Sequence, residues 1–212
     1  MSEIDVFLIS IFLCLITNYI LSKYDFLLDK KFFPHKSLVS KNTVPISGGI
    51  IFILSTLLYL KFEYVSSYII FLIFIVGLLS DLNILKSPSK RFILQIFTIF
   101  ILIFFSQNFV TSIRIPFFDQ LLSNTFFKYF FVILCLLVLI NGSNFIDGVN
   151  TLLIGYFISV VFMILLLINK YNLNIEINNL EIIFSVLLIL FIFNFFEKFF
   201  CGDGGAYVIS LV

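Results

Sequence analysis

The stretch NGSNFIDGVN, Asn141–Asn150, separates two apolar runs, Tyr129–Ile140 and Leu152–Ile168. It contains three asparagines, one aspartate and two glycines. Apolar runs of this length indicate helices that cross a membrane, and hydrocarbon accepts polar groups only where they have partners or line a watery cavity. The stretch is therefore either a plain connecting loop or part of a functional site, and the rest of the chain decides between these.

The composition of the whole chain indicates an integral membrane protein. Of its 212 residues, 61% are hydrophobic and 12% are charged, whereas a soluble domain is about half apolar and about a quarter charged. The long runs are apolar on all sides, so they predict helices and not the alternating strands of a membrane barrel. The net charge of +1 provides no basic field for nucleic acid, and we expect no nucleic-acid partner.

We expect an all-α fold, a polytopic transmembrane helix bundle that forms a single domain over residues 1–212. Seven spans and the start of an eighth are predicted from the apolar runs. The spans are Ile4–Leu21, Gly48–Leu60, Tyr68–Leu79, Phe92–Phe105, Phe126–Ile140, Leu152–Ile168 and Glu181–Phe196, and the eighth is under way at Val212. The first run lacks a basic region before it, so it reads as a retained span and not as a signal peptide.

The basic residues predict the orientation of the bundle. Alternate loops lie on opposite faces of the membrane, and only Lys61, Arg114, Lys128 and Lys170 fall on one face, against the remaining nine of the 13 lysines and arginines on the other. Positive charge is retained in the cytoplasm. We therefore expect a multi-pass protein of the inner (plasma) membrane with its N-terminus outside. The predicted cytoplasmic loops are Ser22–Ser47, Ser80–Arg91, Asn141–Thr151 and Glu197–Gly205.

Those four loops gather the groups that suggest chemistry. Asp81, Asp147 and Asp203 lie on the same face, and Mg²⁺ is usually held by one or two carboxylates together with phosphate oxygens. The glycines around Asp203 allow backbone N–H groups to approach a phosphate closely. Lys41 and its basic neighbours supply positive charge for a diphosphate. Together these features suggest a phosphoryl-type substrate.

Each feature also has an ordinary structural interpretation. Asp-Gly is a common turn pair, and a lysine-rich cytoplasmic loop is the usual mark of orientation. The Gly48-Gly49 pair is more typical of close helix packing than of ligand contact. The convergence of four such loops on one face favours a site over a set of unrelated turns.

Four motifs resemble those of the polyprenyl-phosphate N-acetylhexosamine-1-phosphate transferases of glycosyltransferase family 4. That family includes the phospho-MurNAc-pentapeptide translocase of peptidoglycan synthesis and the initiators of O-antigen and teichoic acid synthesis. The motifs occur in family order and span nearly the whole chain. They are KNTVPISGG (Lys41–Gly49), GLLSDLNILKSPSKR (Gly77–Arg91), NGSNFIDGVN and FCGDGGAY (Phe200–Tyr207).

The resemblance implies a reaction and a role for each matched residue. The reaction is transfer of a sugar 1-phosphate from a UDP-sugar to undecaprenyl phosphate with release of UMP, which initiates cell-envelope polysaccharide synthesis, as in lipopolysaccharide and cell-wall biogenesis. The implied cofactor is Mg²⁺, with Mn²⁺ as the alternative ion, and a homodimer is compatible with the family. The implied residues are Asp203 as metal ligand, Asp81 and Asp147 as catalytic carboxylates, and Lys41, Asn144, Phe200 and Gly204 as substrate-binding groups.

Three departures from the family pattern leave alternatives open. Ser80 replaces the first aspartate of a pair, and Asn150-Thr151 replaces a second Asp-Gly, which favours the O-antigen-type branch. Family members continue to a late histidine-containing loop, whereas this sequence ends at Val212 with His35 as its only histidine. The chain is thus expected to be a fragment or a truncated, non-catalytic relative if it is not the enzyme itself. A small-molecule transporter is the least favoured reading, because the spans carry almost no charge away from their ends.

Overall fold

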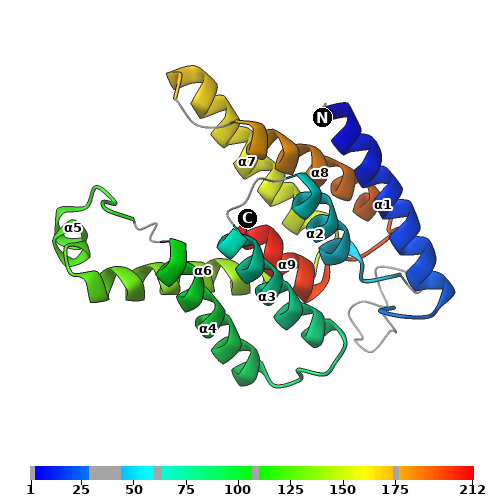
Figure 1. Cartoon of the computed structure of the whole chain (residues 1–212), viewed down its shortest axis with the longest axis horizontal. Coiled ribbons are helices and arrows are strands. Elements are labelled where there is room, and N and C mark those ends of the chain that lie inside the picture. Colours follow the sequence, from blue (N-terminus) through cyan, green and yellow to red (C-terminus); the bar gives the residue numbers. More distant parts are fainter. Residues whose placement is uncertain (1–2, 29–43, 60–63, 107–109, 174–176) are drawn as a thin grey trace.

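The computed structural model describes residues 3–28, 44–59, 64–106, 110–173 and 177–212. Over these residues every element of secondary structure longer than an isolated bridge is a helix (Figure 1). They are α1 (Glu3–Lys23), α2 (Gly48–Tyr59), α3 (Tyr64–Asp81), α4 (Pro88–Ser106), α5 (Pro116–Leu122), α6 (Thr125–Ile146), α7 (Leu152–Tyr171), α8 (Asn178–Phe195) and α9 (Gly202–Leu211). The all-α prediction is confirmed for the described part of the chain.

Each predicted span coincides with a helix, and the described surface is that of a membrane protein. The helices α1, α4, α6, α7 and α8 are long and apolar enough to cross a bilayer, while α2 and the apolar part of α3 are shorter. Large apolar side chains face outward, such as Phe97 (61% exposed) and Val138 (66% exposed). In water an apolar surface of this kind drives association, whereas hydrocarbon accepts it. The protein is a polytopic helical membrane protein.

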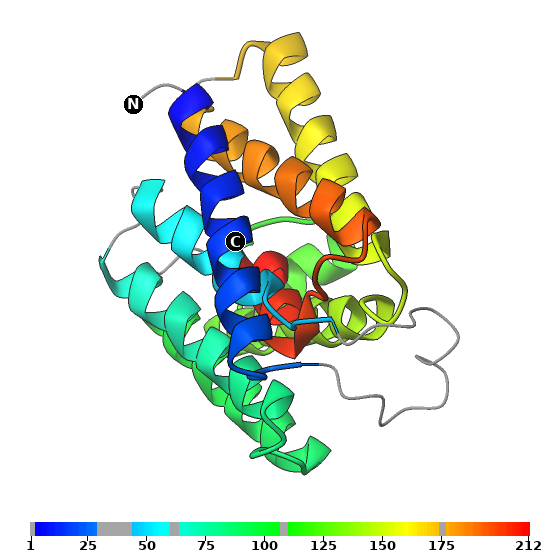
Figure 2. The same cartoon turned by 90° about the vertical axis from the view of Figure 1, so that its right-hand side faces the viewer.

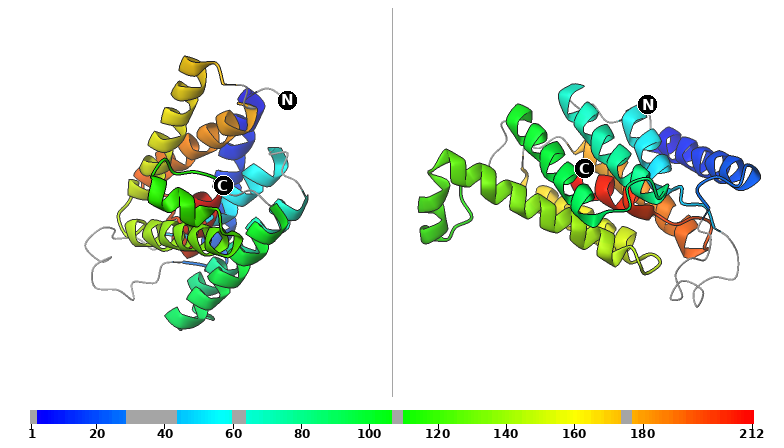
Figure 3. Two further views of the ribbon diagram at one scale, coloured as in Figure 1. Left: turned by 90° about the vertical axis from the view of Figure 1, so that its left-hand side faces the viewer. Right: turned by 90° about the horizontal axis from the view of Figure 1, so that it is seen from below.

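The short helix α9 lies at the centre of the bundle, with α2, α3 and α6 around it (Figures 1 and 2). Its contact with α3 is the most extensive, and the residues from Gly204 to Ser210 are all buried. On one side α1 packs against α8 and α2. On the other, α4 joins α3 to α6, and α5 lies beside the start of α6, away from α9 (Figure 3). The N-terminus of α9 is therefore enclosed by several other elements.

The predicted loop Asn141–Thr151 is wrong in its first half, because α6 continues as a helix to Ile146. The amide of Asn141 donates to the Leu137 carbonyl at 2.8 Å and to Gln95 Oε1 at 3.0 Å. A polar side chain with partners of this kind does not need to leave the helix, so the polar stretch does not end it. The turn is confined to the residues that follow Ile146.

Two other polar loops are shorter than predicted. In the loop Ser80–Arg91, α3 continues to Asp81, and α4 begins at Pro88, a residue that suits the first turn of a helix. In Glu197–Gly205, α9 begins at Gly202. The polar residues that the sequence singles out therefore lie at the ends of helices, where the backbone fixes the direction of each side chain.

Candidate active site

The site is built around the close approach of α9 to α2 and α3. A Cβ added at Gly77 of α3 would overlap the backbone of Gly204 in α9. A Cβ added at Gly49 of α2 would lie 2.5 Å from the backbone nitrogen of Gly205. Only glycine permits helices to come this close. The packing interpretation of the Gly48-Gly49 pair is thus confirmed at Gly49. The close contact at Gly77 brings the first turn of α9 beside the end of α3.

Asp81, at the end of α3, caps the N-terminus of α9. Its Oδ1 accepts the backbone N–H of Asp203 at 2.8 Å, and its Oδ2 accepts that of Gly204 at 3.0 Å. These are N–H groups that a helix leaves without partners of its own, and the helix dipole favours a negative charge there. Asp81 is the last residue of α3, and its pKa is raised to about 7 by burial and, to a smaller extent, by the nearby Asp203 charge. The two backbone hydrogen bonds act in the opposite direction.

Asp203 is held by two residues of the second motif. The Arg91 guanidinium, in the first turn of α4, forms an ion pair with Asp203 Oδ2 at 2.8 Å. The same Arg91 nitrogen donates to Ser80 Oγ at 2.8 Å, and the Ser80 hydroxyl donates to Asp203 Oδ2. These bonds join α3, α4 and α9 at one point. Ser80, which stands where the family pattern has an aspartate, is an uncharged donor to the Asp203 carboxylate.

Asp147 approaches the start of α9 from the opposite side. It is the C-cap of α6, and its Oδ2 accepts the backbone N–H of Gly202 at 3.0 Å. Gly202 has a φ of +75°, and a Cβ at this position would overlap the side chain of Ile46 and lie 2.8 Å from Asp81 Oδ2. The third and fourth motifs are thus joined by a direct hydrogen bond at a residue that must be glycine.

The first motif reaches the site through backbone pairing with the fourth. Ile46 and Phe200 form an isolated parallel bridge, the Phe200 N–H donates to the Pro45 carbonyl at 2.9 Å, and the Gly48 N–H donates to the Phe200 carbonyl at 3.1 Å. The order of the motifs along the chain does not predict this pairing between the first and fourth motifs. Lys41, the predicted substrate-binding residue of the first motif, lies outside the described residues.

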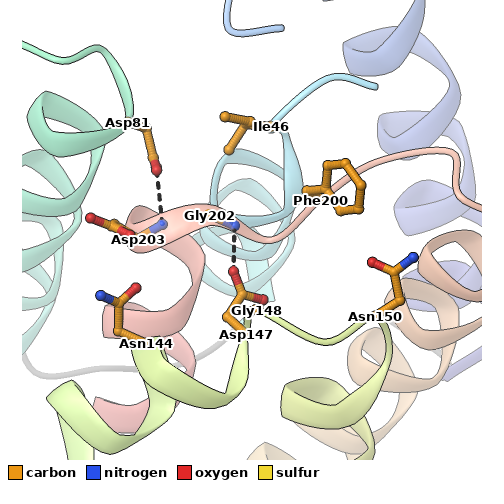
Figure 4. Close-up of a pocket in the computed structure, with 9 residues that line it drawn as sticks. All are labelled: Ile46, Asp81, Asn144, Asp147, Gly148, Asn150, Phe200, Gly202 and Asp203. Atoms are coloured by element: carbon orange, nitrogen blue, oxygen red, sulfur yellow. Dashed lines mark hydrogen bonds between the residues drawn. The ribbon is translucent and has the colours of Figure 1, made fainter. Parts of the chain in front are cut away.

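These segments surround one pocket of about 210 Å³ (Figure 4). Its lining residues are Ile46, Asp81, Asn144, Asp147, Gly148, Asn150, Phe200, Gly202 and Asp203. Five predicted site residues are therefore brought together, namely Asp81, Asn144, Asp147, Phe200 and Asp203. Figure 4 shows the carboxylates of Asp81 and Asp147 directed at the first two residues of α9. The individual roles assigned to these residues stay predictions.

Other residues of the site differ from the prediction. Gly204 is buried and does not line the pocket, and its N–H is bonded to Asp81. Sequence reasoning noted the glycines around Asp203 but missed the hydrogen bond from Gly202 to Asp147, and it missed Ile46 and the support that Arg91 gives to Asp203. Arg91 carried a visible signal, since it is a basic residue within a motif otherwise selected for its aspartate. Its partner Asp203 is 112 residues away in the chain, so no local sequence signal indicates that the two residues pair.

The donor set fits a magnesium ion that takes further ligands from a substrate. Among the described residues there is no group of three or more His, Cys, Asp or Glu side chains poised to hold a metal. Mg²⁺ does not require one, because it commonly binds one or two carboxylates and completes its shell with phosphate oxygens and water. Asp203 and Asp147 both line the pocket and carry oxygens of this type. Either carboxylate fits this mode of binding.

The comparisons with known proteins bear on the family of the chain. The family model described as glycosyl transferase family 4 matches residues 64–212, which include α3 to α9 and every described aspartate of the pocket. No curated protein matches the chain. The match to the family model covers more than half of the sequence. The chain belongs to glycosyl transferase family 4.

Proposed function

We propose that the protein transfers a sugar 1-phosphate, an N-acetylhexosamine 1-phosphate, from a UDP-sugar to undecaprenyl phosphate and releases UMP. The observation that carries the proposal is the convergence of Asp81, Asp147 and Asp203 on one pocket at the ends of apolar helices. Helix ends lie near the surface of a bilayer. A pocket there is accessible both to a water-soluble nucleotide and to the phosphate of a membrane lipid.

The charge balance of the pocket also supports a phosphoryl reaction. Three carboxylates line it, and the Arg91 guanidinium forms an ion pair with one of them, Asp203. Two anionic substrates do not approach such a pocket without additional positive charge. Mg²⁺, when bound, would supply that charge and stabilise the charge that develops on the transferred phosphoryl group. We propose Lys41 as the second source.

In the proposed reaction an oxygen of undecaprenyl phosphate attacks the β-phosphorus of the UDP-sugar. The bond from this phosphorus to the oxygen that bridges the two phosphates breaks, and UMP leaves with that oxygen. The attacking phosphate is already an anion, so positioning and charge stabilisation contribute most of the rate. We propose that Asp81 and Asp147 orient the reacting groups, that Asn144 donates to the nucleotide, and that Phe200 stacks on the uracil ring.

A transfer assay tests the proposal. Membranes that contain the protein are given UDP-GlcNAc labelled in its sugar, undecaprenyl phosphate and Mg²⁺. Label that becomes extractable into butanol, in an amount equal to the UMP released, is the expected result, and omission of undecaprenyl phosphate is the control. A well-folded preparation that releases no UMP contradicts the proposal and favours the non-catalytic relative. The homodimer and the cytoplasmic orientation of the pocket stay predictions.

A further inference from the structure

A single buried amide connects the two loops that form one side of the pocket. Asn194, near the end of α8, is 3% exposed and does not line the pocket. Its Oδ1 accepts the backbone N–H of Thr151 at 2.7 Å. Its Nδ2 donates to the backbone carbonyl of Phe199 at 2.8 Å. One side chain therefore uses its acceptor on the loop after α6 and its donor on the loop before α9.

The residues next to these two bonds face the pocket. Asn150 precedes Thr151, Phe200 follows Phe199, and both line the pocket. Figure 4 shows Phe200 and Asn150 on the same side of it, away from Asp81 and Asp203. We call this side, made by Phe200 and Asn150, the aromatic–amide wall. Its two members come from different loops, so the separation between them depends on whatever holds the loops together.

The backbone at Thr151 shows why such a tie is required. Thr151 has a φ of +66°, a conformation that β-branched residues rarely adopt. A loop with an unfavourable backbone conformation relaxes unless surrounding contacts hold it in place. The bond from Thr151 N–H to Asn194 is short, and it ends on a buried residue. Loss of the amide would leave the Thr151 N–H and the Phe199 carbonyl without this partner and allow both loops to move.

We propose that Asn194 is a positioning residue that sets the geometry of the aromatic–amide wall and thereby the affinity for the nucleotide half of the donor. The inference rests on the proposed function, since it assigns this wall to the uridine nucleotide. An aromatic ring facing an amide suits a planar base with hydrogen-bonding edges. The lipid phosphate has no such feature, and the carboxylates of the pocket are held by contacts that do not involve Asn194. A change at Asn194 should therefore affect nucleotide binding selectively.

The test compares Asn194→Leu and Asn194→Asp with a matched control, Gln95→Leu. Gln95 is also a buried amide, and it joins α4 to α6 by accepting a hydrogen bond from Asn141 at 3.0 Å. The measurements on the detergent-solubilised full chain are the Kd of UMP, the KM values of UDP-GlcNAc and undecaprenyl phosphate, and the melting temperature. Asn194→Leu should raise the UMP Kd and the UDP-GlcNAc KM about tenfold, as expected when the binding-competent loop conformation becomes a minor population. The KM of undecaprenyl phosphate should stay within about twofold of the wild-type value.

Asn194→Asp retains the acceptor for Thr151 and loses the donor to Phe199, so its effect should be intermediate. It also serves if Asn194→Leu fails to fold. The inference is overturned if the UMP Kd does not change, if both KM values rise together, or if Gln95→Leu has the same effect at an equal loss of melting temperature. A wild-type protein that binds UMP but transfers no label contradicts the proposed function alone, and the UMP Kd then still tests Asn194. A wild-type protein that neither binds UMP nor transfers label contradicts both.

Discussion

Asp203-Gly204 lies in the first turn of α9, whereas Asp147-Gly148 follows the end of α6, and both carboxylates line the same pocket. The two glycines differ sharply. Gly204 is buried, and a Cβ added to it would lie 3.3 Å from Asp81 Oδ2 and 3.4 Å from Leu78 N. Gly148 is exposed, and its nearest contact would be an ordinary 3.5 Å to the Phe145 carbonyl. The Asp-Gly pair in α9 therefore lies in tight helix packing, whereas the Asp-Gly pair after α6 lies in an open turn.

The difference lies in which end of a helix each pair occupies. At the N-terminus of α9, free N–H groups and the helix dipole attract the Asp81 carboxylate, and the glycine allows α3 to approach. At the C-terminus of α6, the backbone presents carbonyl groups, so Asp147 points away to the N–H of Gly202. Both carboxylates end beside the first turn of α9. That turn, and not either dipeptide, organises the pocket.

The largest expected effect on the transfer rate comes from removing the carboxylate charge of Asp203 in α9. Asp203→Asn should lower the rate of UMP release on the order of 10³-fold, because it removes the predicted metal ligand and breaks the ion pair with Arg91. Asp147→Asn keeps an oxygen for the Gly202 N–H and should lose less. Initial rates at saturating Mg²⁺ measure both. Asp119→Asn, at a partly buried aspartate of α5 that is bonded to Ser112, is the control. Equal losses at Asp203 and Asp119 would remove Asp203 as a ligand.

Alanine substitutions at Gly204 and Gly148 test whether the two Asp-Gly pairs differ in packing. Gly204→Ala should destabilise the protein by about 2 kcal/mol, because the added methyl group meets Asp81, Leu78 and Phe74 at close range. Gly148→Ala should change stability by less than about 0.5 kcal/mol, as exposed substitutions usually do. Melting temperatures in one detergent report the two values. Equal shifts for the two variants would show that the two Asp-Gly pairs do not differ as described.

The smallest effect is expected at Ser80, which sharpens the picture of the α9 side. Ser80→Ala removes the hydroxyl that bonds to both Asp203 and Arg91. It should lower turnover about fivefold, equivalent to about 1 kcal/mol, because the direct ion pair from Arg91 still holds Asp203. Ser112→Ala breaks a comparable serine–aspartate bond outside the site and is the control. The ratio of the two initial rates is the readout. An unchanged rate in Ser80→Ala would mean that Arg91 alone holds Asp203.

The sequence predicts the helical class and the gathering of the pocket residues, for a physical reason. Apolar runs mark where the chain lies in hydrocarbon, and the polar groups of Asp81, Asn144 and Asp203 have to gather where these runs end. Hydropathy does not mark where helical hydrogen bonding stops. For this reason Asn141–Ile146, whose first amide bonds to Leu137 and Gln95, was wrongly assigned to a loop.

The supporting contacts follow from tertiary structure and have no local signal. Asn194 reaches Thr151 across 43 residues, and Arg91 reaches Asp203 across 112. An asparagine near the end of an apolar run looks like any interfacial residue until the facing loop is known. The glycine at Gly77 is similar, since it is explained only by the backbone of Gly204 in a distant part of the chain. Sequence patterns identify the groups that face a substrate better than those that hold them in place.

The most direct test of the proposed function follows the β-phosphate of the donor. UDP-GlcNAc that carries radioactive phosphorus at this position is incubated with the protein, undecaprenyl phosphate and Mg²⁺. Transfer of a sugar 1-phosphate predicts that the radioactive phosphorus moves into the butanol-extractable lipid as UMP appears in equal amount. If the lipid gains the sugar while the radioactive phosphorus stays in the aqueous phase as UDP, the protein transfers only the sugar, and the proposed reaction is contradicted.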